Sequence, residues 1–168
     1  ELTIISLDKA EEFYKGAYKY GILMQQNEDK FSLKLMGDIL GLMILKRIIK
    51  FHDLYTLTEK EIIDILTNSN DKSVITSWEA FKNTSSVNRT NVKPEGKYYI
   101  SVDCKKRYVN PLCKISREVN RLTDISPIAK KLFDDFLEYN DSKYAYIDHN
   151  DDELIKFSTE GLIKNRSK

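Results

Sequence analysis

The residues most able to do chemistry are the basic side chains between positions 97 and 121. Seven lysines and arginines stand there against two acidic residues, whereas the whole chain carries a formal net charge of +1. Guanidinium groups bind phosphate oxygens bidentately, and lysine adds a point charge. Tyr98, Tyr99 and Tyr108 are near enough in sequence to stack on a base. We therefore predict a nucleotide or phosphate site made by Lys105, Lys106, Arg107, Tyr108, Arg117 and Arg121.

A second interpretation of the same charges needs no ligand. Lysines commonly protect the exposed edge of a sheet against pairing with another chain. If residues 105–108 continue a strand, their side chains alternate between its two faces. Lys106 then shares a face with Tyr108, while Lys105 and Arg107 share the other. Only one of these two sets should matter for a given ligand.

His52 and Asp53 form the pair that comes nearest to a metal site. Two donors do not hold a catalytic divalent ion while leaving a position open for substrate. The only other histidine is His149, and residues 51–57 have the composition of a connection between helices. We therefore predict a surface histidine at position 52 and no metal ligand in this chain. A set of carboxylates and one imidazole lacks the ligand spacing and the central glycine of a calcium loop, which predicts a solvated turn at Asp148, His149, Asp151, Asp152 and Glu153.

Other reaction types lack their sequence motifs. The chain contains no glycine-rich phosphate loop, no nucleophile elbow and no Cys-His arrangement. Cys104 and Cys113 have neither metal-ligand nor redox-motif spacing. Their pattern predicts two reduced thiols.

Length and charge set broad limits on the chain. Its 168 residues suffice for one domain, or two small lobes, with a buried core. Twenty-seven basic residues nearly balance twenty-six acidic ones, so no global field draws the chain to nucleic acid or membrane. The longest apolar run, Ile39–Leu45, is far too short to span a bilayer, and no secretory pattern is visible. We expect a cytoplasmic protein, and the start at Glu1 rather than Met suggests a processed protein or an excised piece.

Helical periodicity dominates the first half of the chain. Apolar residues recur at helical spacing over 7–27, where Gly16 and Gly21 either weaken the helix or permit close approach of a neighbour. The segment 31–50 is apolar nearly all round, which predicts the central helix of a helical part. We expect the buried side chains of this part to include Leu40, Met43 and Ile44, covered by Trp78 and Phe81.

Two helix starts are marked by their capping residues. Thr58 and Glu61 form a capping box ahead of a short apolar run. Ser126 and Pro127 combine an N-cap serine with a first-position proline. The helix that follows carries a single apolar stripe made by Ile128, Leu132, Phe133, Phe136 and Leu137.

One segment alternates with the period of a strand. From Tyr98 to Cys104, apolar residues occupy every second position, which is typical of a half-buried strand. Pro111 cannot donate to a ladder, so the strand ends before it or lies at an edge. Residues 1–5 are apolar enough for another short strand or an extended lead-in. These elements predict an α+β fold that is predominantly helical, with a helical subdomain followed by a small β-sheet or hairpin with a docked helix.

A polar stretch divides the chain in sequence. Residues 84–94 are rich in Asn, Ser and Thr and have no apolar period, which predicts a linker or loop. We predict a helical part at 1–83 and a strand-containing part with its docked helix at 95–168. The tail beyond His149 is mostly charged, with apolar residues spaced for one last helix.

Three motifs stand out in the second half of the chain. They are Lys-Lys-Arg-Tyr-Val-Asn-Pro-Leu at 105–112, Ile-Ser-Pro-Ile-Ala-Lys-Lys-Leu-Phe-Asp-Asp-Phe-Leu at 125–137, and Lys-Tyr-Ala-Tyr at 143–146. Together they resemble the C-terminal end of bacterial HD-domain phosphohydrolases, which are similar to the dNTP triphosphohydrolases. The resemblance covers about 94–147. The metal site of that family needs a histidine, a later His-Asp pair and a distant aspartate, and this chain cannot supply them.

The resemblance implies a non-catalytic C-terminal accessory region of an HD-type (deoxy)nucleotide phosphohydrolase. Such a region would pack on the catalytic HD domain of the same protein, where a divalent metal is expected, and would have no hydrolase activity alone. It would complete a regulatory nucleotide site or an interface of a homo-oligomer, with no membrane partner. The alternative is a stand-alone module that binds nucleotides or nucleic acid through a basic strand edge.

Overall fold

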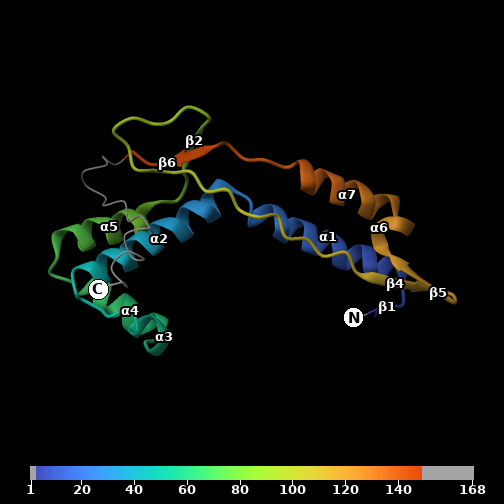
Figure 1. Ribbon diagram of the computed structural model, residues 1–168, viewed down its shortest axis with the longest axis horizontal. Coiled ribbons are helices and arrows are strands. Elements are labelled where there is room, and N and C mark those ends of the chain that lie inside the picture. The colour runs from blue at the N-terminus through green and yellow to red at the C-terminus, as the bar shows by residue number, and fades with distance from the viewer. Residues whose placement is uncertain (1–2, 149–168) are drawn as a thin grey trace, which may run out of the picture. The chain divides into compact units, whose positions relative to one another are not determined.

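The computed structural model describes residues 3–148 and has an α+β architecture, which confirms the predicted fold class (Figure 1). Its contacts divide the chain into two compact units, each built from two separate stretches of sequence. Within the described part, unit 1 comprises residues 3–29 and 103–141, and unit 2 comprises residues 30–102 and 142–148. These cuts fall at other positions than the predicted linker at 84–94.

Unit 1 contains a three-stranded sheet. β1 (Thr3–Ile4) pairs in parallel with β4 (Leu112–Ile115), and β4 turns through two residues into antiparallel β5 (Glu118–Arg121). Ser116, the first turn residue, has φ +57°, the left-handed conformation that such a tight turn requires. The short strand predicted at the start of the chain is confirmed as β1.

Both long helices of unit 1 begin at a serine. Ser6 precedes α1 (Leu7–Leu23), and Ser126 precedes α7 (Pro127–Glu138), which α6 (Leu122–Ile125) leads into. The Ser126 hydroxyl accepts the Ala129 N–H at 3.0 Å, as predicted, and also donates to the Glu11 carboxylate at 2.6 Å. That second bond ties the start of α7 to α1, and the two helices lie side by side (Figure 1).

The core of unit 1 is small. The predicted stripe of α7 is only partly buried, because Phe136 is buried whereas Ile128 and Leu137 are 47% and 42% exposed. Leu132 and Phe133 are half-buried. The buried residues of this core are Ala10, Tyr14, Cys113, Leu122 and Ala129.

Unit 2 is mainly helical. α2 (Asn27–Leu45) enters it from unit 1 and is followed by α3 (Asp53–Thr56), α4 (Glu59–Thr67) and α5 (Lys72–Asn83). The capping box before α4 is confirmed, since the Thr58 hydroxyl accepts the Glu61 N–H at 3.3 Å and the Glu61 carboxylate accepts the Thr58 N–H at 2.7 Å.

Among the described residues, α2 supplies more buried side chains to the core of unit 2 than any other element does. The prediction is confirmed for Met43, which is fully buried, while Leu40 and Ile44 are half-buried against the same cluster. Trp78 and Phe81 belong to this core, as predicted, with their rings stacked at 5.6 Å. The most deeply buried stripe of α2 consists of Phe31, Leu35, Ile39, Leu42 and Met43.

The predicted bounds of the central helix, 31–50, are wrong at both ends. The helix begins earlier, at Asn27, where acidic residues suit the positive end of the dipole. It ends at Leu45 because Arg47 adopts the left-handed conformation, with φ +59°. The Ile48 N–H then reaches the Met43 carbonyl at 2.9 Å, which closes the helix end. Glycine is the residue that usually marks such a helix end in a sequence, so the arginine at position 47 did not indicate it.

A buried polar contact joins α2 to the segment before the sheet of unit 2. The Tyr98 hydroxyl donates to the Asp38 carboxylate at 2.7 Å, and Lys34 donates to the same carboxylate. Burial raises the pKa of the Tyr98 phenol, and the negative charge of Asp38 raises it further. Tyr98 therefore stays a hydrogen-bond donor at any ordinary pH.

The sheet of unit 2 is antiparallel, with strand order β2 (Asn88–Thr90), β6 (Tyr144–Tyr146), β3 (Tyr99–Ile100). β2 lies inside the predicted linker. The strand predicted from Tyr98 to Cys104 is an edge strand, but only Tyr99–Ile100 pairs with β6, and residues 101–104 have no regular secondary structure. The predicted alternation of burial holds, since Tyr98 and Ile100 are buried while Ser101 is exposed.

Candidate phosphate-binding site

Residues 105–111 form an extended segment without regular secondary structure. The segment runs along α1 within unit 1 (Figure 1). No strand pairs with residues 105–108, so the condition on which the alternation of faces was predicted is not met. Arg107 and Tyr108, adjacent in sequence, border the same hollow.

Two contacts fix the middle of this segment to α7. The Lys106 ammonium donates to the carbonyl of Leu137, in the last turn of the helix, where a cation suits the dipole. The ring of Tyr108 packs edge-on against Phe133, with ring centres 4.8 Å apart. Lys106 is therefore committed to the scaffold of the segment.

Asn110 fixes the far end of the segment to the start of α6. Its side-chain amide donates to the Thr123 hydroxyl at 2.9 Å, and its side-chain carbonyl accepts the Thr123 N–H at 3.3 Å. Its backbone carbonyl accepts from the Arg121 guanidinium at 2.9 Å. Because contacts hold the segment on both sides of Arg107, the backbone that carries this residue is already ordered before any ligand arrives.

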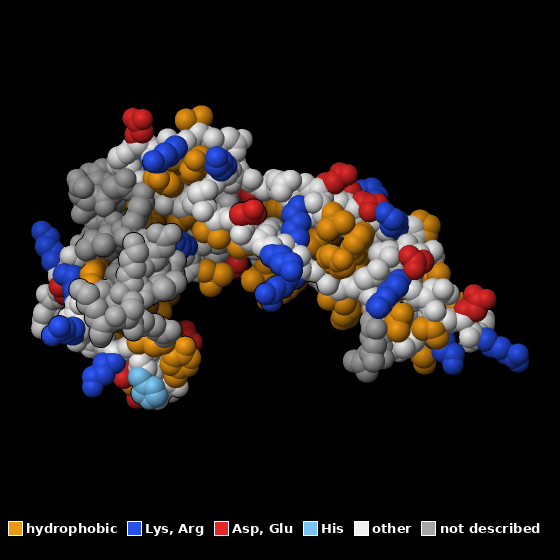
Figure 2. All heavy atoms as spheres, viewed as in Figure 1, with side chains coloured by type: hydrophobic (Ala, Val, Ile, Leu, Met, Phe, Trp, Pro, Cys, Tyr) orange, Lys and Arg blue, Asp and Glu red, His pale blue; other side chains and the backbone are white. Residues whose placement is uncertain are grey.

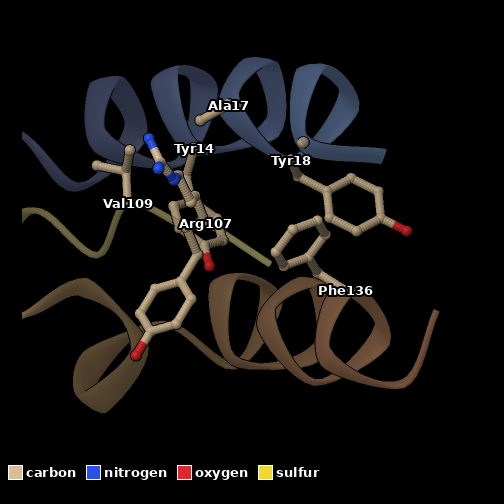
Figure 3. A pocket seen from close by; sticks show the side chains of 8 residues that line it. Tyr14, Ala17, Tyr18, Arg107, Val109 and Phe136 are labelled. Atoms are coloured by element: carbon tan, nitrogen blue, oxygen red, sulfur yellow. The ribbon is translucent and has the colours of Figure 1, made fainter. Parts of the chain in front are cut away.

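Between these anchors lies a small, shallow hollow of about 20 Å³ that is open to solvent (Figure 3). Figure 3 shows Arg107 next to Tyr14 and Val109, with the rings of Tyr18 and Phe136 side by side at the other end. The hollow is lined by four residues of α1, three of the segment and one of α7, which are Tyr14, Ala17, Tyr18, Gly21, Arg107, Tyr108, Val109 and Phe136.

Arg107 is the charged residue in this lining. Its side chain is exposed, and among residues 3–148 its guanidinium has no hydrogen bond or ion pair. A planar guanidinium with free N–H groups can hold a phosphate by two parallel hydrogen bonds. The aromatic walls add faces and edges on which a flat ring can pack.

The buried tyrosine of the lining, Tyr14, stays neutral. Burial raises the pKa of the Tyr14 phenol, and the Asp134 carboxylate and Tyr108 add to the shift. Asp134 is itself paired with Lys130, at 2.5 Å. Because Tyr14 keeps its proton at neutral pH, Arg107 alone sets the charge of the described lining.

A glycine shapes one wall. A Cβ atom at Gly21 would lie 3.0 Å from Cε2 of Phe136, so the missing side chain lets the ring lie against α1. At Gly16 an added Cβ would meet nothing within 4 Å. Of the two glycines, only Gly21 therefore permits the close approach that the sequence suggested.

The other predicted site residues lie apart from the hollow. Lys105 is exposed, and Arg117 lies in the turn between β4 and β5. The register pairs Leu112 with Arg121, so Arg117 is at the opposite end of the hairpin from Arg121. Arg121 borders a second hollow, which shares Tyr108 and Val109 with the first, and that hollow is lined by Ile4, Phe13, Tyr108, Val109, Asn110, Pro111 and Arg121.

The second hollow continues onto an exposed apolar face of α1. Phe13 is 51% exposed, and farther along the helix Tyr20 and Leu23 are 64% and 51% exposed. A shallow depression lies between Phe13 and Tyr20, at Gly16. Figure 2 shows hydrophobic and basic side chains next to each other over α1 and the neighbouring segment. We refer to Phe13, Gly16, Ala17, Tyr20 and Leu23 as the apolar face of α1.

The aromatic walls of the first hollow are not evident in the sequence. Tyr14 fits the apolar stripe of the first helix, Phe136 fits the stripe of α7, and Tyr18 belongs to no pattern. Aromatic residues at helical spacing most often mark a core, and a single sequence does not show which of them border a depression. Sequence reasoning therefore missed the three residues as parts of a site.

Of the two histidines weighed as metal ligands, the structure describes only His52. His52 is exposed at the start of α3, and within residues 3–148 no three His, Cys, Asp or Glu side chains are grouped to hold a metal ion. His149, the acidic residues Asp151, Asp152 and Glu153, and the predicted last helix lie outside the described residues. No helix of the described part is long and apolar enough to cross a membrane.

Comparison with models of known families, with curated proteins and with solved structures finds no match.

Proposed function

We propose that unit 1 binds a phosphate-bearing ligand with a flat ring, of the nucleotide class, in the hollow beside Arg107. One observation carries this proposal: an exposed guanidinium without a described partner is held by an anchored segment over a depression walled by tyrosines and a phenylalanine. The charge suits the phosphate, and the rings suit the base.

The aromatic walls favour a nucleotide over a simple anion. Inorganic phosphate would contact Arg107 but leave Tyr18 and Phe136 unused. A nucleoside without phosphate would use the rings but not the guanidinium. The proposal therefore expects the affinity order nucleotide, then nucleoside, then inorganic phosphate.

The test compares two arginines of unit 1. Calorimetry with nucleoside mono- and triphosphates is run on the wild type, on Arg107→Ala and on Arg117→Ala. Both variants lose one exposed positive charge, but Arg117 lies in the hairpin turn, away from the hollow. We expect Arg107→Ala to lose about tenfold or more in affinity, as for a charged hydrogen-bonded pair. Arg117→Ala should stay close to the wild type.

Two results would contradict the proposal. Equal losses in both variants would mean a general response to net charge. Binding of a single-stranded oligonucleotide far more tightly than a mononucleotide, with a response to Arg107→Ala, would indicate a strand-binding module at this site, with a salt slope that grows with the phosphates contacted.

A second candidate function comes from the apolar face of α1. Exposed apolar patches mark interaction sites more often than chance. We propose that this face packs on a further folded unit, as expected for an accessory region of an HD-type hydrolase. The purified chain should then be inactive toward dNTPs with Mn²⁺, Mg²⁺ or Co²⁺, and turnover that His52→Ala abolishes would refute this role.

A further inference from the structure

The sheet of unit 2 turns three tyrosines to one side. In the antiparallel register Tyr146 lies opposite Tyr99, and Ala145 lies opposite Ile100. Ala145 and Ile100 are buried in the core, at 0% and 4% exposure. Since side chains alternate along a strand, Tyr99, Tyr144 and Tyr146 lie on the other face, away from that core. We call Tyr99, Tyr144 and Tyr146 the tyrosine face.

Two of the rings on this face each have a lysine ammonium group lying over them. The Lys93 ammonium lies 5.8 Å from the ring centre of Tyr99, and the Lys143 ammonium lies 5.4 Å from that of Tyr144. The two tyrosine rings meet edge to face, 5.6 Å apart. Both lysines are exposed, and neither forms an ion pair within residues 3–148. Figure 2 shows basic side chains beside hydrophobic ones over β2 and β6.

The loop that carries Lys93 is tied to the sheet. The side-chain carbonyl of Asn91 accepts the backbone N–H of Lys143 at 3.0 Å, and the Thr90 hydroxyl accepts the Val92 N–H at 3.1 Å. These bonds bring the two lysines to the same sheet from stretches far apart in sequence. The stretches 88–100 and 142–148 contain four basic residues and two acidic ones, so the local charge is positive.

We propose that the tyrosine face binds single-stranded nucleic acid. Two neighbouring tyrosine rings are each paired with a lysine ammonium group. A nucleic acid strand likewise presents one base and one phosphate in each nucleotide, so successive nucleotides could each use one ring and one lysine. Bases stack on aromatic rings irrespective of sequence, and lysines neutralise the backbone. The flexible lysines leave the ring faces and bind phosphates when bases take their place. This inference uses residues of unit 2 alone and does not rest on the hollow beside Arg107.

A single nucleotide fits this face less well than a strand. One base and one phosphate would engage one ring and one lysine, leaving the second pair unused. A duplex fits poorly too, because its bases are already stacked on one another. The face should therefore prefer a strand to a mononucleotide and to a duplex of the same sequence.

The test measures the anisotropy of a fluorescent oligothymidine of about 12 nucleotides, within the span that small single-strand-binding sites cover. Tyr144→Ala should weaken binding about fivefold or more, because base stacking on an aromatic residue is worth that much. Tyr144→Phe keeps the ring and should bind as the wild type does. The matched control is Tyr55→Ala, which removes a tyrosine that is 75% exposed on α3.

Lysine variants supply a second readout that leaves the core intact. The double variant Lys93→Gln/Lys143→Gln should weaken binding and make the salt dependence shallower. The log–log slope should fall by about 0.7 for each phosphate that is no longer neutralised. Lys72→Gln, an exposed lysine at the start of α5, is the control and should leave the slope unchanged.

Several outcomes would overturn the proposal. They are wild-type affinity in Tyr144→Ala, an equal weakening in Tyr55→Ala, an unchanged slope in the double lysine variant, or a duplex that binds as tightly as the single strand. Any of these would leave the lysine-capped tyrosines as a feature of sheet stability alone.

Discussion

The two units are stabilised in different ways. The core of unit 2 is made mainly of large aliphatic and aromatic side chains, and α2 contributes more of them than any other element does. The core of unit 1 contains two alanines and a cysteine among its five buried members, and hydrogen bonds join its elements instead. Ser126 bonds to Glu11, Asn27 to Asp141 and Asn110 to Thr123. A hollow for a polar ligand is easier to keep open in unit 1, because fewer large apolar side chains compete to fill it.

The largest effect should come from the core of unit 2. Leu42→Ala removes a side chain that is 1% exposed and should lower the free energy of unfolding by about 2–5 kcal/mol, because burial is reduced and a cavity is left behind. The matched control is Leu33→Ala on the same helix, where the leucine is 64% exposed and the change should be within about 0.5 kcal/mol. Urea unfolding of both variants checks this. Equal effects would mean that α2 is not buried as described.

The buried polar contact of unit 2 is the exception to its apolar core. Tyr98→Phe removes the donor to Asp38 and should cost about 1–3 kcal/mol, since a buried acceptor loses a partner. Tyr55→Phe removes an exposed hydroxyl and should change nothing. If Tyr98→Phe leaves the free energy of unfolding in urea unchanged, Lys34 alone satisfies the Asp38 carboxylate. Unit 2 would then depend on apolar packing alone, in contrast to the hydrogen-bonded unit 1.

The hydrogen bonds that join the elements of unit 1 can be tested at Ser126, the N-cap of α7. Ser126→Ala removes the acceptor for Ala129 and the donor to Glu11, and should cost about 1 kcal/mol. Ser85→Ala, at an exposed position outside any helix or strand, serves as the control. Amide hydrogen exchange should rise in α7 and α1 of the Ser126 variant. Unchanged protection there would show that the cap does not hold these helices.

The smallest effect is a pH dependence at the capping box. Hydrogen bonds from the Thr58 backbone, and then from its hydroxyl, lower the pKa of Glu61 below its ordinary value. The ionised Glu61 carboxylate therefore stabilises the folded state fully above the ordinary glutamate pKa. This stabilisation is lost as the pH falls through the lowered pKa that Glu61 has in the folded protein. The stability difference between the wild type and Glu61→Gln should therefore be larger at about pH 7 than at about pH 3. A difference that grows toward acid would contradict the capping role.

Local signals in the sequence predicted much of the helical structure. The cap at Ser126 and the box at Thr58 involve neighbours three residues apart, so a short window contains the whole interaction. The end of α2 could not be predicted, because Arg47 takes a conformation that arginine rarely adopts. The parallel pairing of β1 with β4 joins residues far apart in the sequence, Thr3 with Leu112 and Ile4 with Cys113, and no local pattern encodes it.

The candidate site was predictable only on its charged side. Arg107 and Tyr108 lie within the basic stretch that the composition singles out, and the structure places them beside one hollow. Tyr18 and Phe136 reach that hollow from two helices far apart in sequence, so their role depends on packing that a single sequence does not show. Whether these residues bind a ligand remains a prediction.

The discontinuous make-up of unit 1 has a consequence for the order of folding during synthesis. Residues 30–102, most of unit 2, are made between the two stretches of unit 1. β1 must wait for β4, and α1 for α7, so the N-terminal helix leaves the ribosome long before its partner exists. Closing so long a loop adds little to the equilibrium cost, since each doubling of its length costs about 0.6 kcal/mol. The delay is kinetic: the first helix to be synthesised belongs to the unit that closes only after residue 141 has been added.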